Sequence, residues 1–78
     1  MTTPGKFSIT ELPIRLGQFL KLANLAQDGL EARVLVQEGQ VLVNGIVEKR
    51  RGRKLFAGDT VTTEGVCWMI EAGEDQQK

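Results

Sequence analysis

The sequence has no histidine and one cysteine, and these two absences limit the chemistry that the chain can carry. Without histidine, no side chain titrates near neutral pH as a general base, and no imidazole is available for a zinc site. Cys67 alone cannot close an intramolecular disulfide, and its apolar neighbours in Val66–Ile70 are typical of a buried strand. No glycine-rich loop followed by Lys and Ser or Thr is present to hold a triphosphate. We therefore expect no catalysis, no cofactor, no metal and no small-molecule substrate.

Long hydrophobic runs are also lacking. The longest, Val66–Ile70, is far shorter than the roughly 20 residues that cross a bilayer. Residues 1–5 lack the basic and then apolar stretches of a secretory signal. These features predict no membrane partner and a location in the cytoplasm. At 78 residues with 41% hydrophobic side chains, the chain is expected to form one domain with a modest core.

The first helical pattern predicts a helix over residues 13–23. Pro13 suits the first turn of a helix, where its missing N–H is not needed. The apolar residues recur at helical spacing on one face, namely Leu16, Phe19, Leu20 and Ala23. Gly17 lies inside this helix and indicates either a close backbone approach by a neighbouring element or a tolerated weakness of the helix.

A second helix is predicted over residues 29–38. Asp28 and Glu31 have the spacing of a capping box, and Gly39 suits a left-handed stop. The apolar set consists of Leu30, Ala32, Val34, Leu35 and Val36, so we expect the helix to be mostly covered.

The remaining chain has the signals of short strands. Residues 7–9 predict one strand, and the Asn44-Gly45 pair predicts a hairpin that returns over residues 46–50. A second hairpin is predicted over residues 60–71, with its turn at Glu64-Gly65. The predicted fold class is α+β, with two helices packed on a small, mostly antiparallel sheet that contains two hairpins. The expected organisation is a flexible N-terminal segment (1–6), a single domain (7–72) and a disordered tail (73–78).

Charge is balanced overall but unevenly placed. Ten Lys and Arg residues offset ten Asp and Glu residues, and five of the cations lie within Lys49–Lys54. Arg15, Lys21 and Arg33 fall on the polar sides of the predicted helices, so eight cations are expected to share one surface. A solvated charged loop is the alternative interpretation of such a run. However, the run contains three arginines and no acid, which favours forked recognition of phosphate.

Aromatic residues are scarce, and this restricts the kind of nucleic acid. The chain has three Phe, one Trp and no Tyr, and Phe19 and Trp68 are predicted to be in the core. Too few rings remain for a platform that stacks single-stranded bases. Recognition of a folded RNA through its phosphates and shape is therefore predicted. Asn44 at the hairpin tip is a candidate polar contact, although such a turn favours Asn for its positive φ without any ligand.

Several stretches together resemble the S4 RNA-binding domain, and more closely the stand-alone bacterial S4-like proteins. They are residues 14–22, residues 32–33, residues 39–45, residues 50–55 and Gly58-Asp59, within a resemblance that covers about residues 7–71. The resemblance implies an αL-type fold and non-catalytic binding of structured RNA, often ribosomal RNA or a ribosomal particle, without a cofactor. It implies RNA contacts by Arg15, Lys21, Arg33, Lys49, Arg50, Arg51, Arg53 and Lys54.

The sequence departs from the broader S4 pattern at two places. Gly17 stands where Asp is common, and Asp28-Gly29 stands where Ser-Arg is common. An adaptor that binds an acidic protein through the same basic face is the alternative function. DNA binding is a weaker one, because neither helix carries a run of base-reading side chains. If the basic run is a surface element, Arg50, Arg51 and Arg53 should tolerate simultaneous replacement by Glu without loss of folding.

Overall fold

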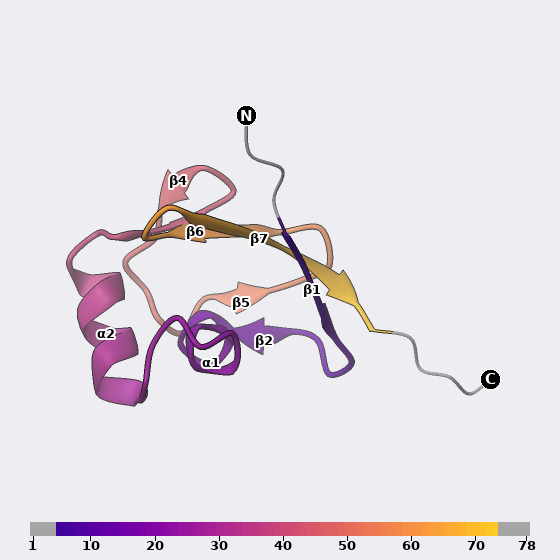
Figure 1. Ribbon diagram of the computed structural model, residues 1–78, viewed down its shortest axis with the longest axis horizontal. Coiled ribbons are helices and arrows are strands. Elements are labelled where there is room, and N and C mark those ends of the chain that lie inside the picture. The colour runs from indigo at the N-terminus through magenta and orange to yellow at the C-terminus, as the bar shows by residue number, and fades with distance from the viewer. Residues whose placement is uncertain (1–4, 74–78) are drawn as a thin grey trace.

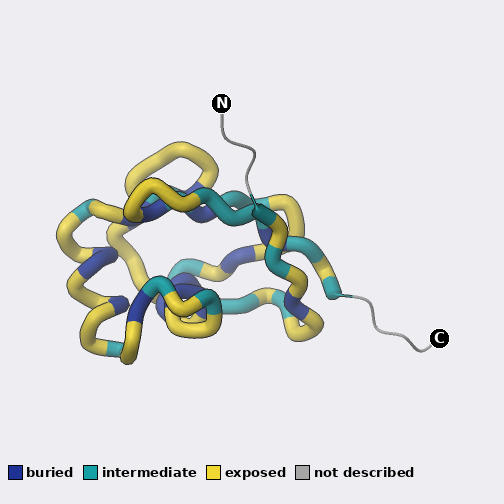
Figure 2. The backbone as a smooth tube through the Cα atoms, in the orientation of Figure 1, coloured by how far each residue is buried: buried dark blue, intermediate teal, exposed yellow. Residues whose placement is uncertain are grey.

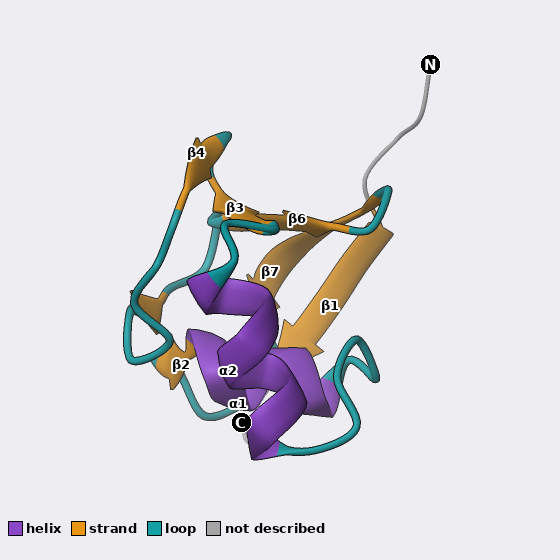
Figure 3. Ribbon diagram, turned by 90° about the vertical axis from the view of Figure 1, so that its left-hand side faces the viewer, coloured by secondary structure: helices purple, strands orange, loops and turns teal. Residues whose placement is uncertain are grey.

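Alternating apolar residues in the second half of the chain form antiparallel strands that pack against two short helices (Figure 1). The computed structural model describes residues 5–73. The elements in chain order are β1 (Gly5–Ile9), β2 (Ile14–Arg15), α1 (Leu16–Leu22), α2 (Gly29–Gln37), β3 (Val41–Val43), β4 (Ile46–Val47), β5 (Lys54–Leu55), β6 (Thr60–Thr63) and β7 (Val66–Ala72). One sheet has the order β1-β7-β6-β3-β4, and β2 pairs with β5 separately. Both helices lie on one side of the larger sheet (Figure 3), which confirms the predicted α+β arrangement.

The core fills the space between the helices and the sheet. Phe19 and Leu20 of α1 are fully buried, as are Val41 of β3 and Ile70 of β7. Phe7 of β1 closes one end, with its ring edge-on to Phe19 at 5.3 Å and to Trp68 at 5.7 Å between centroids. Figure 2 shows buried segments in the helices and central strands, and exposed chain over the loop between β4 and β5. The loop between β4 and β5 is therefore largely exposed to solvent.

The two ends of the described chain pair with each other. β1 runs parallel to β7 with Phe7 opposite Ile70, a pairing that the sequence did not reveal. β1 begins at Gly5, so Gly5 and Lys6 belong to the sheet although a flexible segment was expected at residues 1–6. Gly73 was expected in the disordered tail, but its N–H donates to the Ile9 carbonyl at 2.8 Å. Residues 1–4 and 74–78, the remainder of the two expected loose ends, lie outside the described residues.

The first helix starts later than predicted. Ile14 and Arg15 pair with β5 as a short strand, and α1 begins only at Leu16. Pro13 therefore lies in the loop before β2 and not in the first turn of the helix. Helical spacing of apolar residues does not report such a preceding strand, because its partner lies about 40 residues further along the chain.

The second helix follows its sequence signals closely at both ends. Asp28 Oδ1 accepts a hydrogen bond from the Glu31 N–H at 2.9 Å, and Gly39 has φ +73° beyond the last turn. Its coverage was predicted wrongly, because Leu30 and Val34 remain 68% and 43% exposed. α2 packs through one narrow face only.

Two predicted strand features also differ. The strand after the Asn44-Gly45 turn ends at Val47 and does not continue to residue 50, because the chain turns away at Glu48. Cys67 is half-buried and not fully buried, since β7 leaves much of one face open. No helix among residues 5–73 is long and apolar enough to cross a membrane.

Candidate nucleic-acid interface

The basic loop, residues 49–54, is attached to the start of α1 by backbone hydrogen bonds. The Leu16 N–H donates to the Arg53 carbonyl at 2.8 Å, and the Gly17 N–H donates to the Arg51 carbonyl at 2.9 Å. The first N–H groups of a helix have no partner within the helix, so the loop supplies acceptors that α1 lacks. A Cβ on Gly17 would lie 3.5 Å from the Arg51 carbonyl oxygen, an ordinary contact, so the loop lies against Gly17 without requiring glycine there. This attachment sets Arg51 directly beside α1.

Glu48 holds the other side of the loop. Its carboxylate is 2.9 Å from Arg50 Nε and 2.9 Å from Arg53 Nη1, and it also accepts from the Arg50 N–H at 3.0 Å. Glu48 is only 7% exposed. The Arg50 hydrogen bond, followed by the Arg53 one, lowers the pKa of Glu48 to about 2, against the opposing effect of burial. The carboxylate also raises the pKa of Arg50.

Glu48 was not among the predicted site residues, because it precedes the basic run and is not inside it. The only available signal was the spacing of one acid two and five residues ahead of two arginines. The expected tolerance of glutamate at Arg50, Arg51 and Arg53 together does not fit this geometry. Such a change would place new carboxylates against the buried Glu48 and remove both of its ion pairs.

The ion pairs divide the predicted RNA-binding residues into two groups. Arg50 and Arg53 are neutralised by Glu48, and outside the predicted set Lys6 pairs with Glu71 at 3.5 Å. Six cations are exposed and have no carboxylate of residues 5–73 within 4.0 Å, namely Arg15, Lys21, Arg33, Lys49, Arg51 and Lys54. Of the eight cations expected to share one surface, six are therefore uncompensated within residues 5–73.

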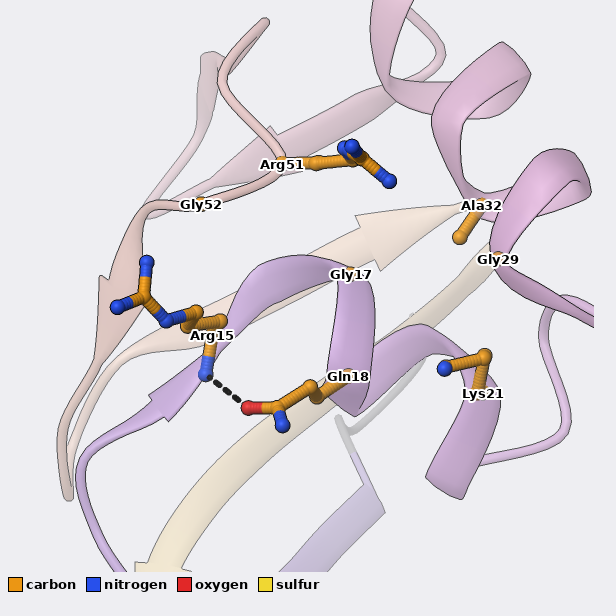
Figure 4. A pocket seen from close by; sticks show the side chains of 8 residues that line it. All are labelled: Arg15, Gly17, Gln18, Lys21, Gly29, Ala32, Arg51 and Gly52. Atoms are coloured by element: carbon orange, nitrogen blue, oxygen red, sulfur yellow. Dashed lines mark hydrogen bonds between the residues drawn. The ribbon is translucent and has the colours of Figure 1, made fainter.

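Three of these cations come from two chain segments and surround one pocket (Figure 4). Arg15 precedes α1, Lys21 lies in its last turn, and Arg51 comes from the basic loop. The pocket has a volume of about 260 Å³, and the other residues that line it are Gly17, Gln18, Gly29, Ala32 and Gly52. Clustered cations with two guanidinium groups form a surface suited to phosphate.

The other three unpaired cations lie outside the pocket lining. Arg33 lies four residues after Gly29 and so on the same face of α2, one turn beyond the pocket. The Lys49 side chain passes Gly39 at the end of α2, with its Cε 3.6 Å from the place of a Cβ on Gly39. Lys54 is exposed at the far end of the loop.

Asn44 has a structural position apart from this pocket. Its φ is +55°, its Oδ1 accepts from the Thr60 N–H at 3.0 Å, and its Nδ2 donates to Asp59 Oδ1 at 3.1 Å. Both ends of the amide are thus used to hold the β3–β4 turn against the start of β6. The geometry favours the turn role over an RNA contact.

Comparison with known proteins assigns the chain to a family. Residues 7–71 match the S4 domain, so the chain belongs to the S4 domain family. It is 52% identical over 58 residues to the Bacillus subtilis (strain 168) "Probable ribosome maturation protein RlbA", covering 74% of this chain and 82% of that protein. It is 40% identical over 60 residues to the Escherichia coli (strain K12) "Putative RNA-binding protein YbcJ", covering 76% of this chain and 86% of that protein.

Solved structures support the same assignment. The solution structure of YbcJ from E. coli, described as revealing an αL motif involved in RNA-binding, is similar with a TM-score of 0.67 and 36% identity, covering 92% of each chain. The trimeric structure of Vibrio cholerae Heat Shock Protein 15 is similar with a TM-score of 0.68 and 26% identity, covering 85% of this chain and 70% of that one. The predicted S4-like fold is confirmed. The two sequence relatives are named for RNA binding and ribosome maturation and not for an enzymatic activity.

Proposed function

We propose that this protein is a non-catalytic RNA-binding module that recognises structured RNA, in ribosomal RNA or a maturing ribosomal particle, within the cytoplasm. The observation that carries the proposal is the convergence of Arg15, Lys21 and Arg51 around one pocket, each without a carboxylate partner in residues 5–73. Uncompensated cations gathered from separate segments attract a polyanion. The name of the B. subtilis relative supports the ribosomal target.

Binding would be electrostatic docking onto phosphates. Each arginine guanidinium can donate two parallel hydrogen bonds to phosphate oxygens, and each lysine acts as a point charge beside them. Each contact releases condensed counterions from the RNA, which drives association. Because Glu48 and the α1 backbone already hold the loop, little further ordering is needed when RNA binds.

Glu48 also limits the charge of this surface. By neutralising Arg50 and Arg53 it leaves Arg51 as the arginine of the run that lines the pocket. A loop with five uncompensated cations would bind any polyanion more strongly. A smaller number of cations in fixed positions favours RNAs whose phosphates have the same spacing as these cations.

Ultraviolet crosslinking in cells, followed by sequencing of the attached RNA, tests this function. We expect discrete segments of ribosomal RNA with the wild-type protein, and their loss in the variant Arg15→Ala, Lys21→Ala, Arg51→Ala. Lys6→Ala is the matched control, since it removes a cation that is paired with Glu71. Recovery of an acidic protein in place of RNA, or unchanged RNA recovery with the triple variant, would contradict the proposal.

A further inference from the structure

The pocket beside Arg15, Lys21 and Arg51 is larger than a phosphate group requires. One water needs roughly 10–15 Å³ of space of this kind, whereas the pocket measures about 260 Å³. The pocket therefore has room for a group attached to the phosphate as well as for the phosphate itself.

Small residues create this space. The parts of the lining that contribute no side chain beyond a methyl group are Gly17, Gly29, Gly52 and Ala32. A Cβ on Gly29 would meet nothing within 4 Å, so the volume that a side chain would occupy there is open beside α1 and the basic loop (Figure 4). Gly17 is instead covered by Arg51, whose Cβ would lie 3.6 Å from a Cβ at that position.

The chemistry of the lining suits a nucleotide. The planar guanidinium groups of Arg15 and Arg51 provide both phosphate donors and faces on which a base can stack. Gln18 Oε1 accepts from the Arg15 N–H at 3.2 Å, which orients the amide and leaves its Nε2 as a donor for an acceptor on a base edge. Stacking on arginine requires no aromatic platform, in keeping with the few aromatic residues in the chain.

We infer that this pocket receives one unpaired nucleotide of the bound RNA, with its phosphate held by Lys21 and the two arginines and its base lying over the glycine-lined floor. This inference rests on the proposed function and specifies it: the RNA would carry a looped-out nucleotide beside a paired segment whose phosphates meet the surrounding cations. The base would lie beside Gly29, which faces open space, and against the guanidinium faces.

A second hollow does not compete for this role. It measures about 830 Å³ and is formed mainly by the loop that joins β1 to β2. Its charged lining residues are Glu11 and Lys21, so it has no excess of positive charge for an anionic nucleotide. Charge therefore favours the smaller pocket.

Nuclear magnetic resonance titration of the full chain tests the inference with small probes. We expect adenosine and uridine 5′-monophosphate to shift the amide signals of Gly17, Gly29 and Gly52 saturably, with a Kd on the order of 1 mM. Inorganic phosphate and the nucleosides without phosphate should each bind at least tenfold more weakly, since either half alone makes part of the contacts.

Gly29→Leu fills the pocket without changing charge. A Cβ at Gly29 meets nothing within 4 Å and the residue begins α2 in ordinary helical geometry, so the variant should fold. We expect it to weaken monophosphate binding at least tenfold. Val34→Leu adds bulk on the side of α2 away from Ala32 and should leave binding unchanged.

Three results would overturn the inference: equal affinity for phosphate and the monophosphates, no saturable shift, or normal binding by Gly29→Leu. If ribosomal RNA still binds in any of these cases, the nucleotide pocket is wrong and the proposed function stands. If the monophosphates bind while ribosomal RNA does not, the proposed function fails instead.

Discussion

Glu48 lies 2.9 Å from Arg50 Nε and 2.9 Å from Arg53 Nη1, so one nearly buried carboxylate joins two arginines of the basic loop. Between these paired residues Arg51 points instead to the pocket that α1 and α2 line (Figure 4). The loop is thus held by Glu48 on one side and by the backbone of α1 on the other. Arg50 and Arg53 therefore stabilise the loop conformation, whereas Arg51 is available to a ligand.

Replacement of Glu48 by Gln should destabilise the fold. Gln keeps the shape but loses both charge-assisted interactions, and we expect the free energy of unfolding to fall by about 1–2 kcal/mol after allowance for the exposure of Arg50. Urea denaturation followed by circular dichroism measures this. Glu11→Gln, at an exposed position, is the matched control and should change stability little. Equal stability of the two variants would contradict the role of Glu48.

The effect of Glu48 on stability should depend on pH. Its pKa is lowered from 4.5 to about 2 by folding, so the unfolded chain takes up a proton more readily. The stabilisation is therefore complete above about pH 4.5 and is lost as the pH falls towards 2. We expect the difference in unfolding free energy between wild type and Glu48→Gln to shrink over that interval. A difference that stays constant down to pH 2 would show that the charge of Glu48 does not contribute.

Arg50 and Arg51 are neighbours in sequence but should respond differently to alanine. Arg51→Ala removes an unpaired cation of the pocket, and we expect RNA affinity to fall about tenfold, or 1.4 kcal/mol, with the fold intact. Arg50→Ala removes a partner of Glu48, and we expect a lower thermal midpoint with a smaller loss of affinity. Filter binding and thermal unfolding of both variants measure the two effects. Equal changes of RNA affinity and of thermal midpoint in the two variants would contradict the different roles of Arg50 and Arg51.

Asn44 should prove to be a turn residue. Asn44→Ala loses two hydrogen bonds and strains a φ of +55°, so we expect destabilisation of about 1–2 kcal/mol with RNA affinity unchanged. Asn44→Gly loses the same hydrogen bonds but tolerates the backbone angle, and it should be less destabilised. Loss of RNA affinity in both folded variants would instead assign Asn44 to the interface.

Local signals in the sequence predicted the elements that depend on nearby residues. The Asp28 cap, the Gly39 stop and the Asn44-Gly45 turn each act within a few residues, and the structure places α2 and the first hairpin at these positions. The parallel pairing of β1 with β7 joins segments some 60 residues apart and leaves no such local pattern. The β2–β5 pair likewise displaced the start of α1 from Pro13.

The candidate site was predicted in part for the same reason. Arg15 and Lys21 were assigned to the polar side of the first predicted helix, and the basic run is visible as a cluster, so these residues could be named from sequence. Which arginine faces the pocket depends on Glu48 and on hydrogen bonds from α1 to the Arg51 carbonyl. These are tertiary contacts, and charge alone does not distinguish Arg51 from Arg50.

The salt dependence of binding to purified ribosomal RNA tests the central claim most directly. With four or five phosphate contacts, log K for the wild type should fall against log salt concentration with a slope of about −3 to −4.5. The variant Arg15→Ala, Lys21→Ala, Arg51→Ala should bind more weakly, and its slope should be smaller in magnitude by about 2 to 2.7, while Lys6→Ala keeps the wild-type slope. A wild-type affinity that does not change with salt, or a triple variant with an unchanged slope, would contradict RNA binding through this surface.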